Sequence, residues 1–546
     1  MPKFNVIIFA DTPVQDTKTR NYGAYRLASH IRENGYSCLV INFASAIDGK
    51  IYNEILESTM GEETFMVGFS TNFMPMRVPG APISTEVPGR SRRDTDIIRF
   101  DTETMYSKRL INEFAKNKSE SWLNRITDIN PKTKIVFGGS GIGFYTDFTN
   151  VDNFIYGLSE TMIIDYLDSI SGRSKKRLFN KVLDYDYKAQ ASTWDFRLSK
   201  TTYTDYDFIT SNETLSLEVA RGCRFKCTYC SYPLIGQKNI DDYLKFKDVL
   251  KEELLDNYHQ WGTTQYYIMD DTFNDSTEKL LMFKEVVDSL PFRIKFWCYL
   301  RLDLLALHPE QIPLLKDVGL EQAYMGIETF HPGAGKAVGK GMKAEKRKEA
   351  LEKCKTIWGD DVHIQAGFMV GLPTEPEESI VETANYLRNP TCPVHEAWIF
   401  PVNIFDGKHT GQGNNWIYKS EFDKNYDKHG YYFSYLDENN RQPYESVNWL
   451  KKEDGSGING FEQATYVAAK HDRTVPKRIY TADFYKSSLN HLILSNRELT
   501  KSMSQEEYKN LIASIDMTNL YFNTVIEQYF NPLLTKLKND NSPTAN

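Results

Sequence analysis

Six short apolar runs alternate with amphipathic stretches between residues 215 and 402 of this 546-residue chain, and this alternation constrains the fold more than any other feature. The runs predict strands at Leu215–Val219, Gln265–Met269, Lys295–Tyr299, Gln322–Ile327, His363–Val370 and Glu396–Val402. The stretches between them predict helices at Tyr243–Tyr258, Thr277–Ser289, Pro309–Val318, Lys343–Trp358 and Glu375–Arg388. Strands that alternate with helices in this way run parallel, so the pattern predicts a partial, open (βα)6 barrel.

A second α/β pattern precedes the barrel. Strands are expected at Phe4–Phe9, Cys38–Phe43, Phe65–Ser70, Lys134–Phe137 and Phe154–Gly157, with a helix at Tyr22–Asn34. This order predicts a doubly wound, Rossmann-like domain over residues 1–175. A linker over 176–210 would join it to the barrel domain at 211–406.

The last part of the chain, residues 407–546, shows little periodicity in its first half and turns helical in its second. Helices are predicted at Ser488–Ser495, Gln505–Ile515 and Leu520–Leu537. We expect a mainly helical cap domain on the open mouth of the barrel, with a disordered tail at Asn539–Asn546.

Three cysteines follow the first barrel strand in the loop Arg221-Gly-Cys-Arg-Phe-Lys-Cys-Thr-Tyr-Cys230. Cys223, Cys227 and Cys230 are spaced C-x3-C-x2-C, so three thiolates on one loop can bind three irons of a cubane and leave the fourth iron open. The alternative is a zinc knuckle that a distant fourth ligand completes, because structural zinc takes four closed ligands.

The loop resembles the cluster-binding signature of the radical S-adenosylmethionine (radical SAM) enzymes, including the aromatic Tyr229 before the third cysteine. The resemblance implies a 4Fe–4S cluster on Cys223, Cys227 and Cys230. The open iron would bind the amino and carboxylate groups of SAM, and reductive cleavage would release a 5′-deoxyadenosyl radical. A flavodoxin or ferredoxin is the implied electron donor.

Other family elements follow at the strand ends in the expected order, namely Met269-Asp-Asp-Thr, Met325-Gly-Ile-Glu-Thr329 and Gly367-Phe-Met-Val-Gly371. The implied SAM-binding residues are Tyr229, Asp270, Asp271, Arg301, Glu328, Gly367 and Gly371. For the two aspartates, a turn and helix cap is the structural alternative. For Arg301, a salt bridge to Asp303 or to the aspartate pair is the alternative.

The first domain resembles the cobalamin-binding domain that precedes the barrel in one large radical SAM subgroup, through Val136-Phe-Gly-Gly-Ser140 and Gly157-Leu-Ser-Glu-Thr161. The resemblance implies a cobalamin site near Ser70, Gly138, Gly139 and Gly157. Relatives that ligate cobalt through histidine carry Asp-x-His-x-x-Gly after the first strand, whereas this chain has Asp11-Thr-Pro-Val-Gln-Asp16. We therefore expect either cobalamin without a histidine ligand, or a domain that kept the fold and lost the cofactor.

Composition narrows the remaining classes. A net charge of −8 gives no clear nucleic-acid signal, no apolar stretch approaches the roughly 20 residues of a membrane span, and seven cysteines with three in one loop do not form a disulfide framework. A reducing cytoplasm is the expected location. Cys38, Cys298, Cys354 and Cys392 are expected to be small buried residues.

The resemblance favours a radical SAM enzyme that methylates an unactivated carbon by transfer of a methyl group from methylcobalamin. A radical SAM mutase, cyclase or epimerase without cobalamin is the first alternative. A non-catalytic iron–sulfur or zinc protein is the second.

Overall fold

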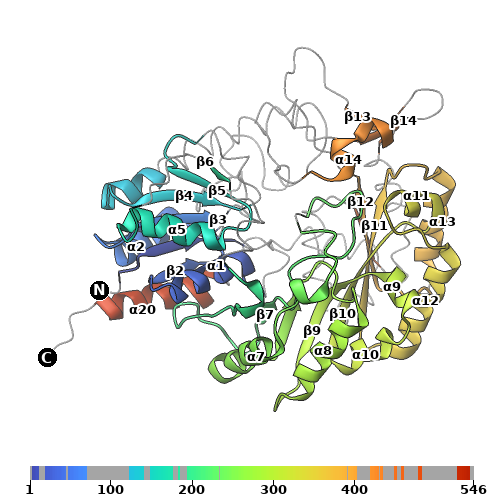
Figure 1. Ribbon diagram of the computed structural model, residues 1–546, viewed down its shortest axis with the longest axis horizontal. Helices are drawn as coiled ribbons and strands as arrows, with labels where there is room; N and C mark the ends of the chain where they lie inside the picture. The colour runs from blue at the N-terminus through green and yellow to red at the C-terminus, as the bar shows by residue number, and fades with distance from the viewer. Residues whose placement is uncertain are drawn as a thin grey trace, which may run out of the picture.

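The computed structural model describes residues 3–11, 19–44, 47–70, 122–139, 148–175, 182–184, 194–232, 234–389, 391–402, 419–429, 431–433, 448–451, 457–459, 478–481 and 525–541. Figure 1 shows two α/β domains side by side, the N-terminal one in blue and teal and the barrel in green and yellow. The C-terminal helix, in red, lies against the N-terminal domain. The fold class predicted from the sequence is confirmed.

The N-terminal domain contains one parallel sheet in the order β2-β1-β3-β4-β5-β6. Its strands are β1 Val6–Phe9, β2 Cys38–Ile41, β3 Met66–Ser70, β4 Lys134–Gly138, β5 Asn153–Tyr156 and β6 Val182–Asp184, and its helices are α1 Tyr22–Glu33, α2 Gly49–Thr59 and α5 Glu160–Ser171. This is the flavodoxin-like strand order, in which ligands bind beyond the carboxyl ends of the strands where the order reverses.

Buried apolar runs explain these strands. All four residues of β1 and of β2 are buried, as expected where helices cover both faces of a parallel sheet. Asn21 caps α1 by accepting a hydrogen bond from the Ala24 amide, and Asp48 caps α2 in the same way from Ile51. The sequence did not predict α2 or the short edge strand β6, which lies within the expected linker.

The barrel sheet has seven parallel strands in the order β16-β12-β11-β10-β9-β8-β7. They are β7 Thr214–Leu217, β8 Gln265–Ile268, β9 Lys295–Leu300, β10 Leu320–Glu328, β11 His363–Val370, β12 Glu396–Pro401 and β16 Arg478–Thr481. The helices are α7 Lys247–Trp261, α8 Thr277–Asp288, α9 Leu302–Leu307, α10 Gln311–Asp317, α11 Pro332–Ala337, α12 Ala344–Trp358 and α13 Glu377–Arg388, with 3-10 turns η4 Phe196–Leu198 and η5 Ile240–Asp242. Each of the six predicted strands is present.

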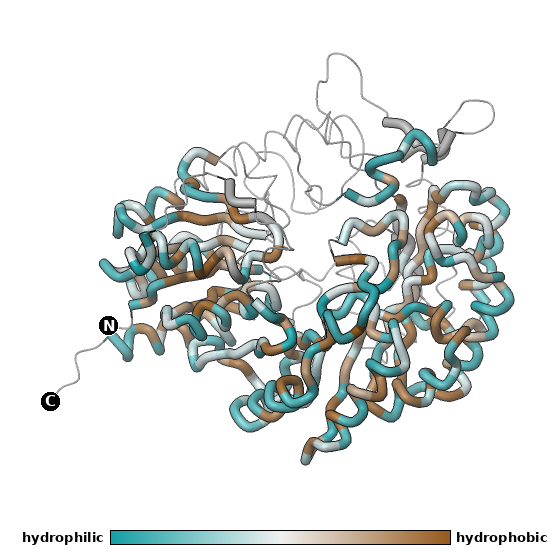
Figure 2. Tube along the Cα trace, in the orientation of Figure 1, coloured by the Kyte–Doolittle hydropathy of each residue, from teal (hydrophilic) through white to brown (hydrophobic). Residues whose placement is uncertain are grey.

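The barrel strands alternate between two environments. In β9, Phe296, Cys298 and Leu300 are buried in the core beneath the helices. Trp297 and Tyr299 point to the opposite face. Figure 2 shows the resulting hydropathy pattern, with apolar segments along the strands and polar helix surfaces outside. Because all seven strands are parallel, their carboxyl ends lie at one rim of the barrel.

The described elements of the C-terminal region do not form a single cap domain. Its described elements are α14 Glu421–Lys424, η6 Tyr426–His429, the antiparallel strands β13 Tyr431–Phe433, β14 Asn448–Lys451 and β15 Gly457–Asn459, the π-helical turn η7 Ile526–Phe530 and α20 Asn531–Asn541. The Phe422 amide donates to the Thr228 carbonyl, so α14 lies beside the cysteine loop. The helices expected at 488–515 lie outside the described residues.

The last helix differs from the expected cap. Its apolar side chains join the core of the N-terminal domain, where they contact the sheet and α2, and the Tyr529 hydroxyl donates to the Val40 carbonyl at 3.1 Å. The helix continues to Asn541, so the predicted disordered tail begins too early. A short helical sequence could not reveal this partner, because the sheet it covers is nearly 500 residues earlier.

We expect Leu533→Ala to loosen the N-terminal domain while leaving the barrel intact. Leu533 is fully buried, and such truncations cost about 2–5 kcal/mol because a cavity remains. Hydrogen exchange should quicken in β1 and β2 and stay unchanged in β10 and β11. Lys538→Ala, on the exposed face of the same helix, is the matched control. Equal exchange in the two variants would contradict the assignment of this helix to the N-terminal core.

Candidate active site

The cysteine loop begins directly after β7 and is fixed by backbone hydrogen bonds. The Cys223 amide donates to Leu234, the Gln237 amide donates to Cys223, and the Cys230 amide donates to Cys227. Cys223 is buried, whereas Cys227 and Cys230 are partly exposed. Gly222 has φ +140°, a left-handed conformation that favours glycine at the entry to the loop.

Each of the three thiols has a hydrogen-bonding partner. Arg301 Nη1 donates to Cys227 Sγ at 3.3 Å, and the Tyr232 amide donates to Cys230 Sγ at 3.4 Å. The Thr272 hydroxyl lies 3.6 Å from Cys223 Sγ. Donors of this kind stabilise thiolates that carry cluster charge and tune the cluster's reduction potential. The loop therefore fits an anionic iron–sulfur cluster.

Burial raises the pKa of the Cys223 thiol and raises that of Cys230 to about 11. Metal binding must therefore displace protons from these groups. Among the residues that the structure describes, no three His, Cys, Asp or Glu side chains gather closely enough to hold a single metal ion. In a cubane each thiolate binds a different iron, so the three sulfurs stand further apart than the ligands of one ion.

Both carboxylate oxygens of Asp270 contact groups of the protein itself. Its Oδ1 accepts the amides of Val219 and Ala220, each at 2.9 Å, and its Oδ2 lies 2.8 Å from the Lys279 ammonium. Both charged side chains are fully buried. The carboxylate of Asp270 thus holds the start of the cysteine loop against α8, and the predicted contact of Asp270 with SAM stays a prediction.

Asp271 is the more exposed member of the pair. Its side chain remains in contact with solvent. Partial desolvation by the surrounding protein, and next the negative charge of Asp270, raise the pKa of Asp271 to about 7. Tyr232, next to the cysteine loop, hydrogen-bonds to this carboxylate. Of the two aspartates, Asp271 is the one that a ligand above the loop can reach.

Arg301 lies beside the cysteine loop and also forms a salt bridge with Asp303. Its guanidinium contacts Cys227, stacks over the Phe225 ring at 4.0 Å, and forms a two-pronged ion pair with Asp303 at 2.6 and 3.0 Å. The salt bridge that the sequence left open is therefore present. Arg301 lies at the cysteine loop as an anchored positive charge.

Glu328 forms the second charged centre at the rim. Its Oε1 accepts the Tyr229 hydroxyl at 2.7 Å and pairs with Lys340 Nζ at 2.7 Å. Glu328 has φ +64°, which is uncommon for a residue other than glycine and marks strain that a functional site can hold. Gly326 leaves space for this pair, since an added Cβ would lie 2.7 Å from Glu328 Oε1.

The glycines of β11 lie where the sequence predicted. Gly367 pairs with Gly326 across the sheet, and a Cβ there would lie 2.5 Å from the Tyr324 hydroxyl. Gly371 follows the strand with φ +78°. The absence of a side chain at Gly367 thus makes room for the Tyr324 hydroxyl.

In the N-terminal domain, the residues predicted near cobalamin gather at one sheet edge. Ser70 and Gly138 are register partners at the carboxyl ends of β3 and β4. Gly139 and Gly157, at the ends of β4 and β5, have φ +114° and +77°. A Cβ on Gly138 would make only an ordinary contact, at 3.8 Å. An extended part of a ligand can therefore lie close to the backbone at this end of the sheet.

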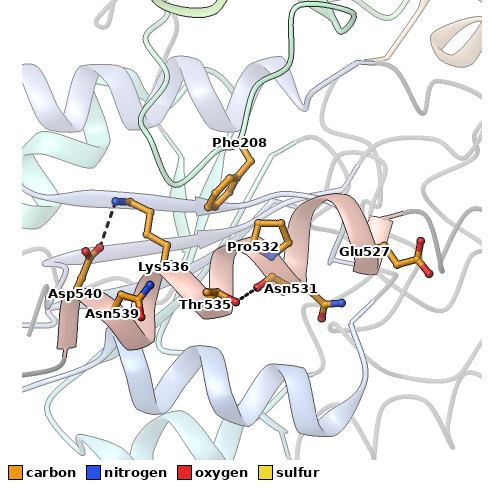
Figure 3. A pocket seen from close by; sticks show the side chains of 8 residues that line it. All are labelled: Phe208, Glu527, Asn531, Pro532, Thr535, Lys536, Asn539 and Asp540. Atoms are coloured by element: carbon orange, nitrogen blue, oxygen red, sulfur yellow. Dashed lines mark hydrogen bonds and ion pairs between the residues drawn. The ribbon is translucent and has the colours of Figure 1, made fainter.

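A surface hollow elsewhere does not belong to this site. It measures about 540 Å³ and is lined by Phe208 and by residues of the C-terminal helix, as Figure 3 shows. None of the cysteines or strand-end carboxylates contributes to it.

Comparison with known proteins agrees with the geometry. Residues 217–387 match the Radical SAM superfamily. An uncharacterized methyltransferase of Pyrococcus horikoshii is 21% identical over 316 residues, a match that covers 54% of this chain and 64% of the relative. The chain thus spans less than two thirds of that curated relative.

Two solved structures share the whole architecture. The radical SAM methyltransferase TsrM from Kitasatospora setae, solved with cobalamin and a [4Fe–4S] cluster, matches with a TM-score of 0.58 and 12% identity over 98% of this chain and 100% of TsrM. The cobalamin-dependent radical SAM enzyme OxsB matches with a TM-score of 0.51 and 12% identity over 98% of this chain and 80% of OxsB.

Residues 217–387 therefore form a domain that matches the radical SAM superfamily, and a radical SAM domain implies a 4Fe–4S cluster and SAM as cofactors. The chain's two-domain fold, with a Rossmann-like domain before the barrel, is similar to that of TsrM and of OxsB. No helix in the described ranges is long and apolar enough to cross a membrane.

Several site residues escaped prediction. Lys279 and Thr272 have no motif of their own, since their roles arise only when α8 and β8 pack beside the loop. Glu218 and Arg221, which pair with each other, do carry a signal in the spacing Glu-x-x-Arg-Gly-Cys. The other four cysteines are buried, as predicted, and none of them forms a disulfide bond in the described part of the chain.

Proposed function

We propose that this enzyme methylates an unactivated carbon, with SAM cleavage in the barrel and cobalamin in the N-terminal domain. The net reaction takes one substrate C–H bond, two SAM and two electrons from a flavodoxin or ferredoxin. It yields the C–CH3 product, methionine, 5′-deoxyadenosine and S-adenosylhomocysteine. The substrate hydrogen ends in 5′-deoxyadenosine, and the new methyl group comes from the second SAM.

The observation that carries this proposal is one ion pair that joins the carboxyl-end side of the barrel sheet to the carboxyl-end side of the N-terminal sheet. Arg221, in the loop after β7, pairs with Glu160, the first residue of the helix after β5, at 2.5 Å. In both folds the chemistry lies at the carboxyl ends of the strands. A cofactor on the N-terminal edge would therefore face the cysteine loop.

The residues have separate tasks in this scheme. Cys223, Cys227 and Cys230 would hold the cluster, which when bound supplies the electron that cleaves SAM. Asp271 and Glu328 offer carboxylates to the SAM ammonium, because an unpaired charge at a partly buried site is costly. The small residues of the N-terminal edge would hold cobalamin, which when bound supplies a transferable methyl group.

Metal analysis of the protein reconstituted anaerobically with iron, sulfide and hydroxocobalamin tests the proposal. We expect about four irons and roughly one cobalt per chain, with no histidine nitrogen on the cobalt. Ser70→Trp should remove cobalt and leave iron, since the indole would fill the space at the end of β3. Lys132→Trp, at the exposed amino end of β4, is the matched control.

Iron without cobalt in the parent would favour the alternative, a radical SAM mutase, cyclase or epimerase whose first domain kept the fold and lost the cofactor. The missing histidine after β1 is the sequence feature that favours this alternative.

Glu328→Ala and Asp271→Ala should each weaken SAM binding roughly ten- to hundredfold, because a lost contact to a charged ligand costs about 1.5–3 kcal/mol. The cluster should survive in both variants, since neither carboxylate is a predicted iron ligand. Equilibrium dialysis with SAM measures the effect. Glu321→Ala, at the exposed amino end of the same strand as Glu328, is the control. Unchanged SAM affinity in both variants would make these residues structural.

A further inference from the structure

A buried ion network joins the two domains beside the cysteine loop. Arg221 donates from Nη1 to Glu160 at 2.5 Å, and from Nε and Nη2 to both oxygens of Glu218 at 2.8 and 2.7 Å. The exposed fractions of the three side chains are 7% for Arg221, 7% for Glu160 and 11% for Glu218. One guanidinium thus binds a carboxylate from each domain.

The surroundings of Arg221 restrict it further. The rings of Trp194 and Phe196, from the segment that connects the domains, each lie 4.9 Å from its guanidinium carbon. The Arg221 amide donates to the Tyr243 carbonyl at 2.9 Å. A guanidinium held by two carboxylates and two aromatic rings is a rigid connection rather than a surface pair.

The ion pair between Arg221 and Glu160 joins two segments that lie close in sequence to the predicted cofactor-binding residues. Arg221 stands two residues before Cys223, and Glu160 stands three residues after Gly157, whose turn ends the proposed cobalamin edge. A shift of α5 relative to the barrel must therefore move the cysteine loop or break the ion pair.

We propose that Arg221 is a positioning residue whose pair with Glu160 sets the distance between the cysteine loop and the cofactor edge of the N-terminal domain. The inference rests on the proposed function. The pair would serve methyl transfer between the domains and leave SAM cleavage at the cluster unaffected.

Glu160→Gln tests this, because it removes the interdomain charge without altering size. Glu213→Gln is the matched control, since Glu213 pairs with Arg20 at 2.7 Å between the same two domains but at the amino end of β7. Arg221→Lys, which keeps the charge and loses the fork, is a second variant if Glu160→Gln does not fold.

Three readouts are expected to separate the variants. Hydrogen exchange over residues 219–232 should rise about ten- to hundredfold in Glu160→Gln and not in Glu213→Gln, the range expected for one lost charge-assisted hydrogen bond. In protein carrying cobalamin, magnetic coupling between the reduced cluster and cob(II)alamin should weaken in electron paramagnetic resonance. S-adenosylhomocysteine should fall about tenfold or more, with 5′-deoxyadenosine unchanged.

Equal exchange, coupling and product ratio in Glu160→Gln and Glu213→Gln would overturn the inference and leave the pair as a structural contact only. Loss of 5′-deoxyadenosine in step with S-adenosylhomocysteine would also overturn it, because SAM cleavage itself would then depend on the pair. The exchange experiment needs no cobalamin. A parent without cobalt would thus refute the proposed function while the exchange data still decide whether Glu160 holds the cysteine loop.

Discussion

Replacing Cys223, Cys227 and Cys230 together with alanine should abolish cluster binding and all SAM cleavage. The three thiols are the predicted iron ligands, and each has its own hydrogen-bonding partner at the loop. The broad absorption of the reconstituted protein at roughly 400 nm, expected for thiolate-to-iron charge transfer, should disappear. Iron content and 5′-deoxyadenosine should both fall to background.

Cys38→Ala is the control for this experiment. Cys38 is buried in β2, away from the loop, and should leave the iron content unchanged. A triple variant that keeps its full iron would show that the cluster is held elsewhere.

Lys279→Met should destabilise the barrel by about 3–5 kcal/mol, the typical cost of leaving a buried charge without its partner. Lys279 and Asp270 are both fully buried and 2.8 Å apart, and Asp270 also accepts the two amides that precede the cysteine loop. Chemical denaturation monitored by hydrogen exchange in β7 and β8 measures the loss. The double variant Asp270→Asn with Lys279→Met should recover part of the stability, because it buries no lone charge.

Lys284→Met is the matched control on the same helix. Lys284 pairs with Asp288 and Asp317 at the surface, where ion pairs contribute about 0–1 kcal/mol. If both lysine variants lost the same small amount, Asp270 and Lys279 would not anchor the loop.

The barrel strands could be predicted because each one depends on the hydrophobic pattern of residues that are neighbours in the sequence. Strands such as β11 were located to the residue, since an apolar run flanked by helical patterns defines a buried parallel strand. The candidate site residues came from the resemblance to the family instead, and the structure places Ser70, Gly138, Glu328 and Gly371 at or just after the carboxyl ends of strands in the two sheets.

What the sequence could not predict depends on contacts between distant segments. β16 completes the barrel edge from a segment where no strand was predicted, and α20 packs on a sheet that forms at the other end of the chain. Asp270 and Asp271 are neighbours of the same type, and only the burial of Lys279 against one of them separates their roles.

The most direct test of the central claim is the yield of two SAM products, measured with and without cobalamin. The protein is reconstituted with iron and sulfide, reduced, and incubated with SAM, and 5′-deoxyadenosine and S-adenosylhomocysteine are quantified together. We predict 5′-deoxyadenosine in both samples and S-adenosylhomocysteine only in the sample that contains cobalamin. Absence of 5′-deoxyadenosine from both samples, or S-adenosylhomocysteine that forms equally without cobalamin, would contradict the account.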